Sequence, residues 1–254
     1  MTVRPPRGAL EDAALCLVFF TRLPLPQLDL RGRTLAQAIW AAPVAGLAVA
    51  ILAGLVYGLA TEFGLAAGPA AALALSASLL ATGGLHEDGL SDVADGFGGG
   101  RTRETKLEIM RDSRIGSYGA AALGLSLLLR WSALAELGSP WHVLAALVAA
   151  HCASRGLFGA FMRFLPPART DGLSAGAGTV TQNTALAGAL LGVMGLLVLG
   201  TGTAIAAMML LAAVFLGFRQ LCLTQIGGQT GDTMGTLQQF GEIAILLVAS
   251  ASFT

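Results

Sequence analysis

The run AQAIWAAPVAGLAVAILAGLVYGLA, residues 36–60, contains no charged side chain and decides the structural class of this protein. A helix rises about 1.5 Å per residue, so a run of this length spans the roughly 30 Å hydrocarbon core of a bilayer. Further apolar stretches follow at 66–82, 119–137, 141–162, 185–200, 202–218 and 240–254. The sequence therefore predicts an all-α polytopic helical membrane protein with about seven transmembrane helices, and six to eight are compatible with the short final stretches.

The composition of the whole chain supports lipid as its main solvent. The 254 residues are 55% hydrophobic and only 12% charged, and the mean hydropathy is +0.72. A soluble protein cannot cover its surface with so few charges, and a chain this hydrophobic is not disordered. The 15 basic residues balance the 15 acidic ones, which excludes a basic nucleic-acid-binding protein. We expect a single integral-membrane catalytic domain over residues 1–254.

The basic residues divide into groups that are separated by two predicted spans each. These groups are Arg4, Arg7, Arg22, Arg31 and Arg33; Arg101, Arg103, Lys106, Arg111 and Arg114; Arg155, Arg163 and Arg169; and Arg219. All four groups therefore face one side, which the positive-inside rule identifies as the cytoplasm. This topology predicts cytoplasmic loops at 83–118, 163–184 and 219–239, with the N-terminus inside and the C-terminus outside.

Small residues recur at the spacing that lets membrane helices approach each other closely. Gly46, Ala50, Gly54 and Gly58 repeat every four positions, and Gly188 with Gly192 repeats the pattern. In lipid the hydrophobic effect does not drive helices together. Close van der Waals contact at faces of small residues drives their association instead. We expect these positions to serve packing.

Charge is concentrated in one segment, which begins TGGLHEDGLSDVADG at residues 82–96. Asp88, Asp92 and Asp95 stand at i, i+4 and i+7, so a helix places them within an arc of about 60°. Carboxylates crowded on one face repel each other unless a cation neutralises them. Oxygen-only ligands suit Mg²⁺, with Mn²⁺ as a second choice, and Mg²⁺ completes its shell with water and phosphate. The pattern predicts a metal–diphosphate site at the cytoplasmic edge of the second span; a solvated acidic helix is the alternative.

Candidate phosphate ligands follow in LEIMRDSRIG, residues 107–116. Arg111 and Arg114 are three apart on a predicted helix and can fork onto phosphate oxygens, with Ser113 beside them. Asp112 is a candidate catalytic carboxylate, and structural ion pairs are the alternative for these arginines. Arg155 lies deep in an apolar run, where an ionisable group is functional or paired, so we expect it to contact substrate phosphate or the Asp cluster.

Two further candidates lie outside that segment or at its edge. The stretch GGQTGDTMG, residues 227–235, predicts an irregular loop whose amides, with Thr230 and Asp232, close over a metal or nucleotide. A plain connecting turn is the alternative. His86 borders the first carboxylate and could be a base, a metal ligand or a hydrogen-bond partner that orients Asp88, or it could be structural.

These blocks resemble one known family, cobalamin synthase or adenosylcobinamide-GDP ribazoletransferase. The resemblance rests on residues 82–96, 107–116 and 227–233, with weaker support from FFTRLPLP at 19–26 and ASRG at 153–156. The blocks follow the family's order over almost the whole chain. Glu87 departs from the residue expected inside the family's His-x-Asp-Gly motif.

The resemblance implies a Mg²⁺-dependent, multi-pass enzyme of the bacterial inner (plasma) membrane with its active site facing the cytoplasm. A ribose hydroxyl of α-ribazole or α-ribazole 5′-phosphate would attack adenosylcobinamide-GDP, releasing GMP and forming adenosylcobalamin or its phosphate. Asp88, Asp92 and Asp95 would hold the metal, and Arg111, Arg114 and Arg155 the phosphoryl oxygens. A carboxylate or His86 would accept the proton. A homo-oligomer, or a complex with other cobalamin-assembly enzymes, is compatible with this reading.

Two other functions share some of these features. A membrane phosphotransferase for another nucleotide-activated alcohol, such as a CDP-alcohol, uses similar carboxylates, but its usual D-G-x₂-A-R spacing is absent from this sequence. A cation transporter could use the Asp cluster as its ion site, but its carboxylates should lie near the bilayer midplane in two related halves.

Overall fold

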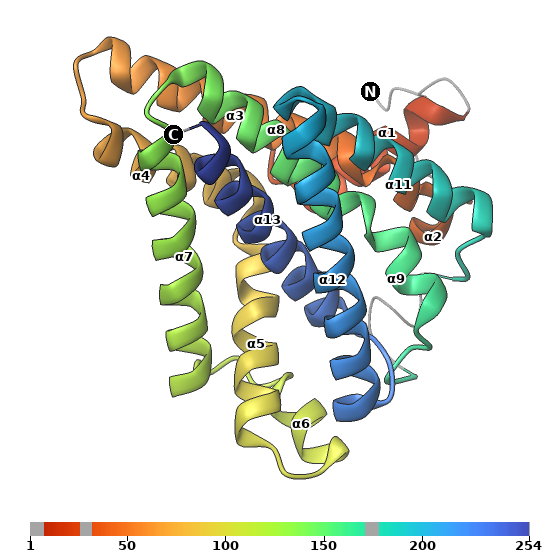
Figure 1. Ribbon diagram of the computed structural model, residues 1–254. Helices are drawn as coiled ribbons and strands as arrows, with labels where there is room; N and C mark the ends of the chain where they lie inside the picture. The colour runs from red at the N-terminus through yellow and green to blue at the C-terminus, as the bar shows by residue number, and fades with distance from the viewer. Residues whose placement is uncertain (1–7, 26–31, 171–177, 254) are drawn as a thin grey trace.

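The computed structural model describes residues 8–25, 32–170 and 178–253, which form a bundle of helices (Figure 1). Arg4, Arg7, Arg31 and part of the expected 163–184 loop lie outside the described residues. The helices are α1 (Ala9–Phe20), α2 (Leu35–Ala38), η1 (Ile39–Ala41), α3 (Ala42–Glu62), α4 (Ala67–Thr82), α5 (Leu85–Gly99), α6 (Arg103–Ile109), α7 (Ser117–Leu137), α8 (Pro140–Gly156), α9 (Phe158–Phe164), α11 (Gln182–Leu196), η2 (Leu197–Leu199), α12 (Thr201–Ile226) and α13 (Gly231–Phe253). The predicted all-α class is confirmed.

Six helical stretches in the described part of the chain are long and apolar enough to cross a membrane. They are Leu35–Glu62, Ser117–Leu137, Pro140–Phe164, Gln182–Leu199, Thr201–Ile226 and Gly231–Phe253. The bent pair α4 and α5 makes a seventh if it is counted as one broken span. The protein is thus a multi-pass helical membrane protein, as the sequence predicted.

The expected 219–239 loop is wrong. Helix α12 continues to Ile226 and α13 already begins at Gly231, so only residues 227–230 connect them. The polar first turns of α13 are helical because their side chains are used inside the fold: Thr236 donates to the carbonyl of Gly89, and Gln239 donates to Glu87. A hydropathy pattern cannot detect such partners from another helix.

The expected 83–118 loop is also wrong in its first half, because α5 packs against α7 and α13 within the bundle (Figure 1). Two consecutive glycines cause the sharp turn before it. Gly83 and Gly84 have φ of 67° and 71°, a left-handed conformation that side chains disfavour, and both amides donate to the carbonyl of Leu79. Helix α4 therefore ends, and α5 leaves at 89° to it.

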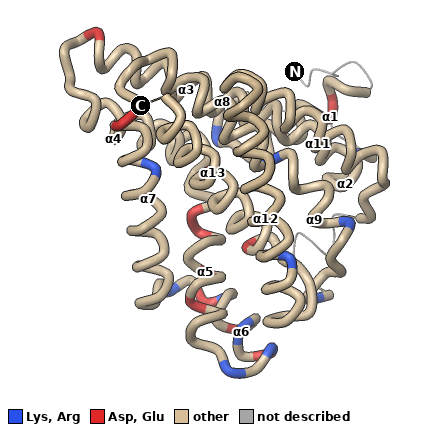
Figure 2. Tube along the Cα trace, in the orientation of Figure 1, with Lys and Arg blue, Asp and Glu red and all other residues tan. Residues whose placement is uncertain are grey.

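The helix ends alternate between the two ends of the bundle. At one end, the Tyr57 hydroxyl donates to the carbonyl of Gly138 at 3.2 Å, and His142 stacks on Phe253. At the other end, Arg103 donates to the carbonyl of Ile226 at 2.9 Å. Charged residues gather at this second end, around α5, α6 and the last turns of α12 (Figure 2). This arrangement fits seven crossings with the bent pair as one of them.

Small residues bring the helices into close contact, as predicted for Gly46 and the Gly188/Gly192 pair. A Cβ on Gly46 of α3 would lie 2.3 Å from the carbonyl oxygen of His151 on α8. A Cβ on Gly156 of α8 would lie 2.8 Å from the carbonyl oxygen of Gly188 on α11. Larger side chains here would separate helices that form the centre of the bundle.

Candidate active site

A polar cavity opens beside the first half of α5. It holds about 1150 Å³ of empty space, part of which is open solvent, and its charged and hydroxyl-bearing lining is Arg22, Glu87, Asp88, Ser91, Asp92, Ser113 and Arg114. The structure therefore brings together four residues that the sequence predicted for one site. Guanidinium groups and carboxylates around one cavity are the chemistry that binds a diphosphate with a divalent cation.

Arg22 is one member of this cavity to which the sequence assigned no role. Its amide donates to the carbonyl of Ala81 at 2.6 Å, which places the segment after α1 across the end of α4. A Cβ on Gly83 would lie 2.8 Å from Nε of Arg22, so the glycine at the bend leaves room for this side chain. Its position inside FFTRLPLP, one of the family-like blocks, was the available signal.

Asp95 does not share the environment of Asp88 and Asp92. Its carboxylate is buried and accepts hydrogen bonds from the amides of Gly116 (2.7 Å) and Gly119 (2.9 Å), at the beginning of α7. A Cβ on Gly119 would lie 2.3 Å from this carboxylate. Asp95 therefore caps a helix, and helical spacing alone could not show that its oxygens are already used.

The predicted helix through Arg111 and Arg114 is wrong, because α6 ends at Ile109. In the turn that follows, Nε of Arg114 donates to Asp112 at 3.0 Å. This guanidinium lowers the pKa of the Asp112 carboxyl below its usual range. Ser113 and Arg114 line the polar cavity, whereas Arg111 and Asp112 line neither of the two cavities described in this section.

Asp232 lies in the first turn of α13 and not in a loop. Arg169 donates to its carboxylate at 2.6 Å and the Thr230 hydroxyl donates at 3.1 Å, so Thr230 is used inside the fold. The backbone of α13 touches α5 here: a Cβ on Gly89 would lie 2.7 Å from the carbonyl oxygen of Asp232. The structure thus brings Asp232 to the acidic face of α5. The sequence analysis did not identify Arg169 as the partner of Asp232; it counted Arg169 only among the basic residues after the fourth span.

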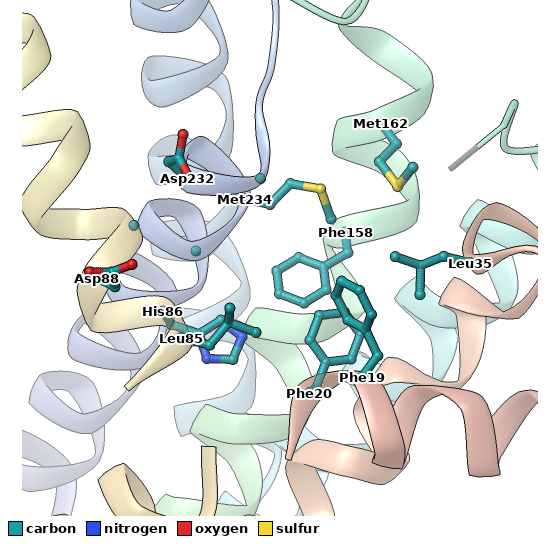
Figure 3. A pocket seen from close by; sticks show the side chains of 13 residues that line it. Phe19, Phe20, Leu35, Leu85, His86, Asp88, Phe158, Met162, Asp232 and Met234 are labelled. Carbon is teal, nitrogen blue, oxygen red and sulfur yellow. The ribbon is translucent and has the colours of Figure 1, made fainter. Parts of the chain in front are cut away.

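A second cavity, lined mainly by aromatic and aliphatic side chains, lies between α5, α1 and α9 (Figure 3). It holds about 660 Å³ of empty space, part of which is open solvent, and its walls are Phe19, Phe20, Leu35, Leu85, His86, Asp88, Gly89, Phe158, Met162, Gly231, Asp232, Met234 and Gly235. The ring of His86 is nearly parallel to those of Phe20 and Phe158, at centroid distances of 6.0 and 6.1 Å. His86 is therefore part of an aromatic wall.

The two cavities meet at α5, because Leu85 and Asp88 line both of them. Asp92 belongs to the polar cavity alone, and Asp232 to the aromatic cavity alone. Two ligands, one in each cavity, would therefore come closest to each other at Asp88. This is the geometry of a site for two substrates.

Arg155 lines neither cavity. Its side chain is buried, and its Nη1 donates to Nδ1 of His151 at 3.0 Å and to the carbonyl of His151 at 3.2 Å. The expectation that it contacts substrate phosphate or the Asp cluster is not supported by this placement. The position of Arg155 deep in an apolar run indicated that it has a partner. That partner is His151, inside the protein, and not a ligand.

Arg155 borders a buried polar network that the sequence analysis missed. Nη1 of Arg130 donates to Glu87 at 2.9 Å and to Glu242 at 3.1 Å, and His151 lies 3.3 Å from Glu242. All four side chains are buried. The available signals were Arg130 and Glu242 inside two predicted spans, and the unusual Glu87 beside the metal motif.

The donor set can be tested against the metal that the family resemblance implies. In the residues that the structure describes, no three His, Cys, Asp or Glu side chains converge as a ready set of metal ligands. Asp88 and Asp92 nevertheless offer two carboxylates to the polar cavity, and Mg²⁺ is often held by one or two carboxylates with phosphate and water. The residues present fit Mg²⁺ or Mn²⁺ held jointly with a substrate; they do not fit a metal enclosed by protein.

The family model for cobalamin-5-phosphate synthase (CobS) matches residues 12–250 of the chain. An adenosylcobinamide-GDP ribazoletransferase of Mesorhizobium japonicum is 68% identical over 249 residues, which cover 98% of this chain and 96% of the relative. The protein of that name from Bradyrhizobium diazoefficiens is 51% identical, covering 96% and 95% of the two chains. One from Shewanella pealeana is 40% identical, covering 94% and 95%. No solved structure shows a significant match.

Proposed function

The chain belongs to the cobalamin-5-phosphate synthase family, and we propose that it transfers the adenosylcobinamide-phosphate group of adenosylcobinamide-GDP to α-ribazole or α-ribazole 5′-phosphate. GMP leaves, and adenosylcobalamin or its phosphate forms. The observation that carries this proposal is the meeting of a polar and an aromatic cavity at Asp88. Group transfer between two substrates requires adjoining sites that hold the reacting atoms at their boundary.

The polar cavity suits the diphosphate of the donor. The guanidinium groups of Arg22 and Arg114 and the hydroxyl of Ser113 would bind phosphoryl oxygens. Asp88 and Asp92 would hold Mg²⁺ or Mn²⁺, which when bound neutralises the diphosphate and the charge that develops on GMP. These five side chains position the phosphorus beside the second cavity.

The reaction then needs a hydroxyl nucleophile and a proton acceptor on the acceptor side of Asp88. A bond forms between the ribose oxygen and phosphorus, the bond from phosphorus to the GMP oxygen breaks, and the hydroxyl proton passes to a carboxylate. We assign that role to Asp232, because it lines the aromatic cavity together with Asp88. The ion pair with Arg169 at 2.6 Å holds this carboxylate in place.

The charged end of the bundle would face the cytoplasm of a bacterium, with the protein in the inner membrane. The support is the Lys and Arg side chains of α6 and the turns beside it, which the positive-inside rule assigns to the cytoplasm; acidic side chains lie among them (Figure 2). Single cysteines at Glu104 and Phe63 test the orientation, since both positions are exposed and belong to opposite ends. An impermeant thiol reagent added to intact cells should label F63C and not E104C; labelling of E104C alone would reverse the topology.

The activity is tested with purified protein in lipid nanodiscs, supplied with adenosylcobinamide-GDP, α-ribazole and Mg²⁺. Release of GMP that depends on α-ribazole is expected. A CDP-activated alcohol replaces the donor in a parallel reaction and should release no CMP. GMP release that fails in the complete mixture would overturn the proposed function, and CMP release would favour the broader phosphotransferase reading.

A further inference from the structure

We propose that the aromatic cavity binds the base of the acceptor nucleoside, so that α-ribazole enters there and the nucleotide of the donor does not. The inference rests on the proposed function and adds which substrate occupies which cavity. It concerns the cavity in Figure 3, between α1, α5, α9 and the beginning of α13.

The lining favours a flat, apolar ligand. Phe20 and Phe158 lie 5.3 Å apart between ring centroids, Phe19 packs edge-on against Phe20 at 4.9 Å, and two methionines complete the wall. Aromatic faces bind flat bases by stacking, and thioethers adapt to their edges. The space of about 660 Å³ between these walls includes open solvent, so the cavity has a mouth through which a ligand can enter.

One buried polar side chain in this lining lacks a partner. His86 is only 2% exposed, and its Nε2 has no hydrogen-bond partner within the described ranges 8–25, 32–170 and 178–253. A buried polar atom without a partner is costly, and less than 1 Å² of Nε2 is open in this structure, so the imidazole must turn toward the cavity for a ligand atom to complete it. In the tautomer with the proton on Nε2, His86 donates one hydrogen bond to a ring nitrogen.

The base of α-ribazole, 5,6-dimethylbenzimidazole, matches this lining. It is a flat bicycle with two methyl groups and a single free ring nitrogen, which accepts one hydrogen bond. Guanine carries several donors and acceptors on its edges, and most of them would be buried without partners among Phe19, Phe20 and Phe158. The cavity therefore discriminates between the two substrates in two ways: it lacks hydrogen-bond partners for guanine, and His86 offers one donor to the benzimidazole.

The position of the cavity agrees with this assignment. Asp88 lines both cavities, and Asp232 belongs to the wall of the aromatic cavity together with it (Figure 3). A nucleoside whose base lies against Phe20 and Phe158 has its ribose near these carboxylates. Its hydroxyl then lies between the proposed proton acceptor and the phosphorus of the donor.

The first experiment measures binding without turnover. α-Ribazole is equilibrated with the protein in nanodiscs, with neither donor nor metal present, and the bound fraction is determined by dialysis. Phe19→Ala should weaken its binding about tenfold, because one stacking ring contributes about that much. The affinity for adenosylcobinamide-GDP should be unchanged.

Phe63→Ala is the matched control, because Phe63 is 82% exposed at the opposite end of the bundle. It should alter neither affinity. Equal loss of both ligands in Phe19→Ala, or loss of the donor alone, would overturn the assignment. So would α-ribazole binding that Phe19→Ala does not change, as expected if lipid fills the cavity.

The second experiment tests His86 through a pair of bases. Wild-type protein should bind 5,6-dimethylbenzimidazole about tenfold more tightly than 5,6-dimethylindole, which lacks the accepting nitrogen. His86→Phe keeps an aromatic ring in the wall and should bind the two equally. A preference that persists in His86→Phe would contradict the hydrogen bond, and the Phe19→Ala result stands independently if this variant does not fold.

Failure of this inference can be told from failure of the proposed function. Protein that binds α-ribazole through Phe19 but releases no GMP loses the function and keeps the cavity assignment. Protein that releases GMP, with a KM for α-ribazole that Phe19→Ala does not raise, keeps the function and loses the assignment.

Discussion

Glu87 and Asp88 are adjacent on α5, yet Glu87 is buried in the polar network and only borders the polar cavity, whereas Asp88 is exposed to both cavities. Glu87 is buried and accepts hydrogen bonds from Arg130 and Gln239. Asp88 is exposed and lines both cavities. Two neighbouring carboxylates thus differ in what neutralises them: the protein supplies the counter-charge of Glu87, whereas Asp88 is left for a ligand.

The contacts of Glu87 inside the bundle explain how Asp88 is held at the cavities. Arg130 on α7 bridges Glu87 on α5 and Glu242 on α13, so one guanidinium joins three helices. Burying charges costs several kcal/mol for each ion, and the contacts must offset it. The net gain over an apolar core is therefore small, although removing one partner is costly, and the contacts fix the rotation of α5. That rotation directs Asp88 toward the cavities.

The largest effect is expected on the interior side. Arg130→Met leaves Glu87 and Glu242 buried without their shared cation, and breaking such a pair costs about 3–5 kcal/mol. Unfolding of the protein in detergent should show this as a lower midpoint temperature. The double variant Arg130→Met with Glu242→Met should be less destabilised than Arg130→Met alone. If Arg130→Met unfolds like the wild type, the network does not hold α5.

Next in size is the effect at the cavities. Asp88→Asn removes a charge with little change in volume, so the midpoint of unfolding should stay near the wild-type value. GMP release should fall about 10²-fold or more, since Asp88 stands at both binding sites and would share in holding the metal. The initial rate at increasing Mg²⁺ checks it. A chelator such as EDTA should stop the wild-type reaction, and near-normal turnover of Asp88→Asn would contradict the site.

The sequence predicted the membrane fold because long apolar runs are a strong signal that needs no knowledge of partners. It also predicted that Asp88, Asp92, Ser113 and Arg114 belong together, and the polar cavity unites them. The 89° turn after α4 was not predicted, although Gly83 and Gly84 are its cause. A pair of glycines shows that a bend is possible and leaves its direction to tertiary packing.

The remaining errors concern partners that are distant in the sequence. In the sequence, Arg155 and Asp95 both look like charged residues that are available for a ligand. In the structure, Arg155 donates to His151, and Asp95 accepts from amides at the beginning of α7. Arg130 and Glu242 were overlooked because their runs still pass as spans. Helical spacing identifies which residues share a face, and it cannot show what lies opposite that face.

A smaller effect separates the cap from the metal ligands. Asp95→Asn replaces one acceptor oxygen by an amide group that faces the N–H groups of Gly116 and Gly119, and should lower stability by about 1–2 kcal/mol. The Mg²⁺ concentration for half-maximal rate should stay within about twofold of wild type. An increase as large as that of Asp92→Asn, the matched control, would restore Asp95 to the metal site.

The smallest effect is expected where an ion pair is exposed. Asp112 accepts from Arg114 outside the polar cavity, and exposed pairs contribute little to stability. Asp112→Asn should therefore leave the unfolding midpoint unchanged and alter GMP release less than about twofold, since Arg114 remains at the cavity. Arg114→Gln is the contrasting variant: it should raise the KM for adenosylcobinamide-GDP about tenfold, because it removes a charged phosphate ligand. If Asp112→Asn abolished the reaction while Arg114→Gln did not, Asp112 would be the catalytic carboxylate that its position in LEIMRDSRIG suggested, and the turn after α6 would have to close over the cavity during catalysis.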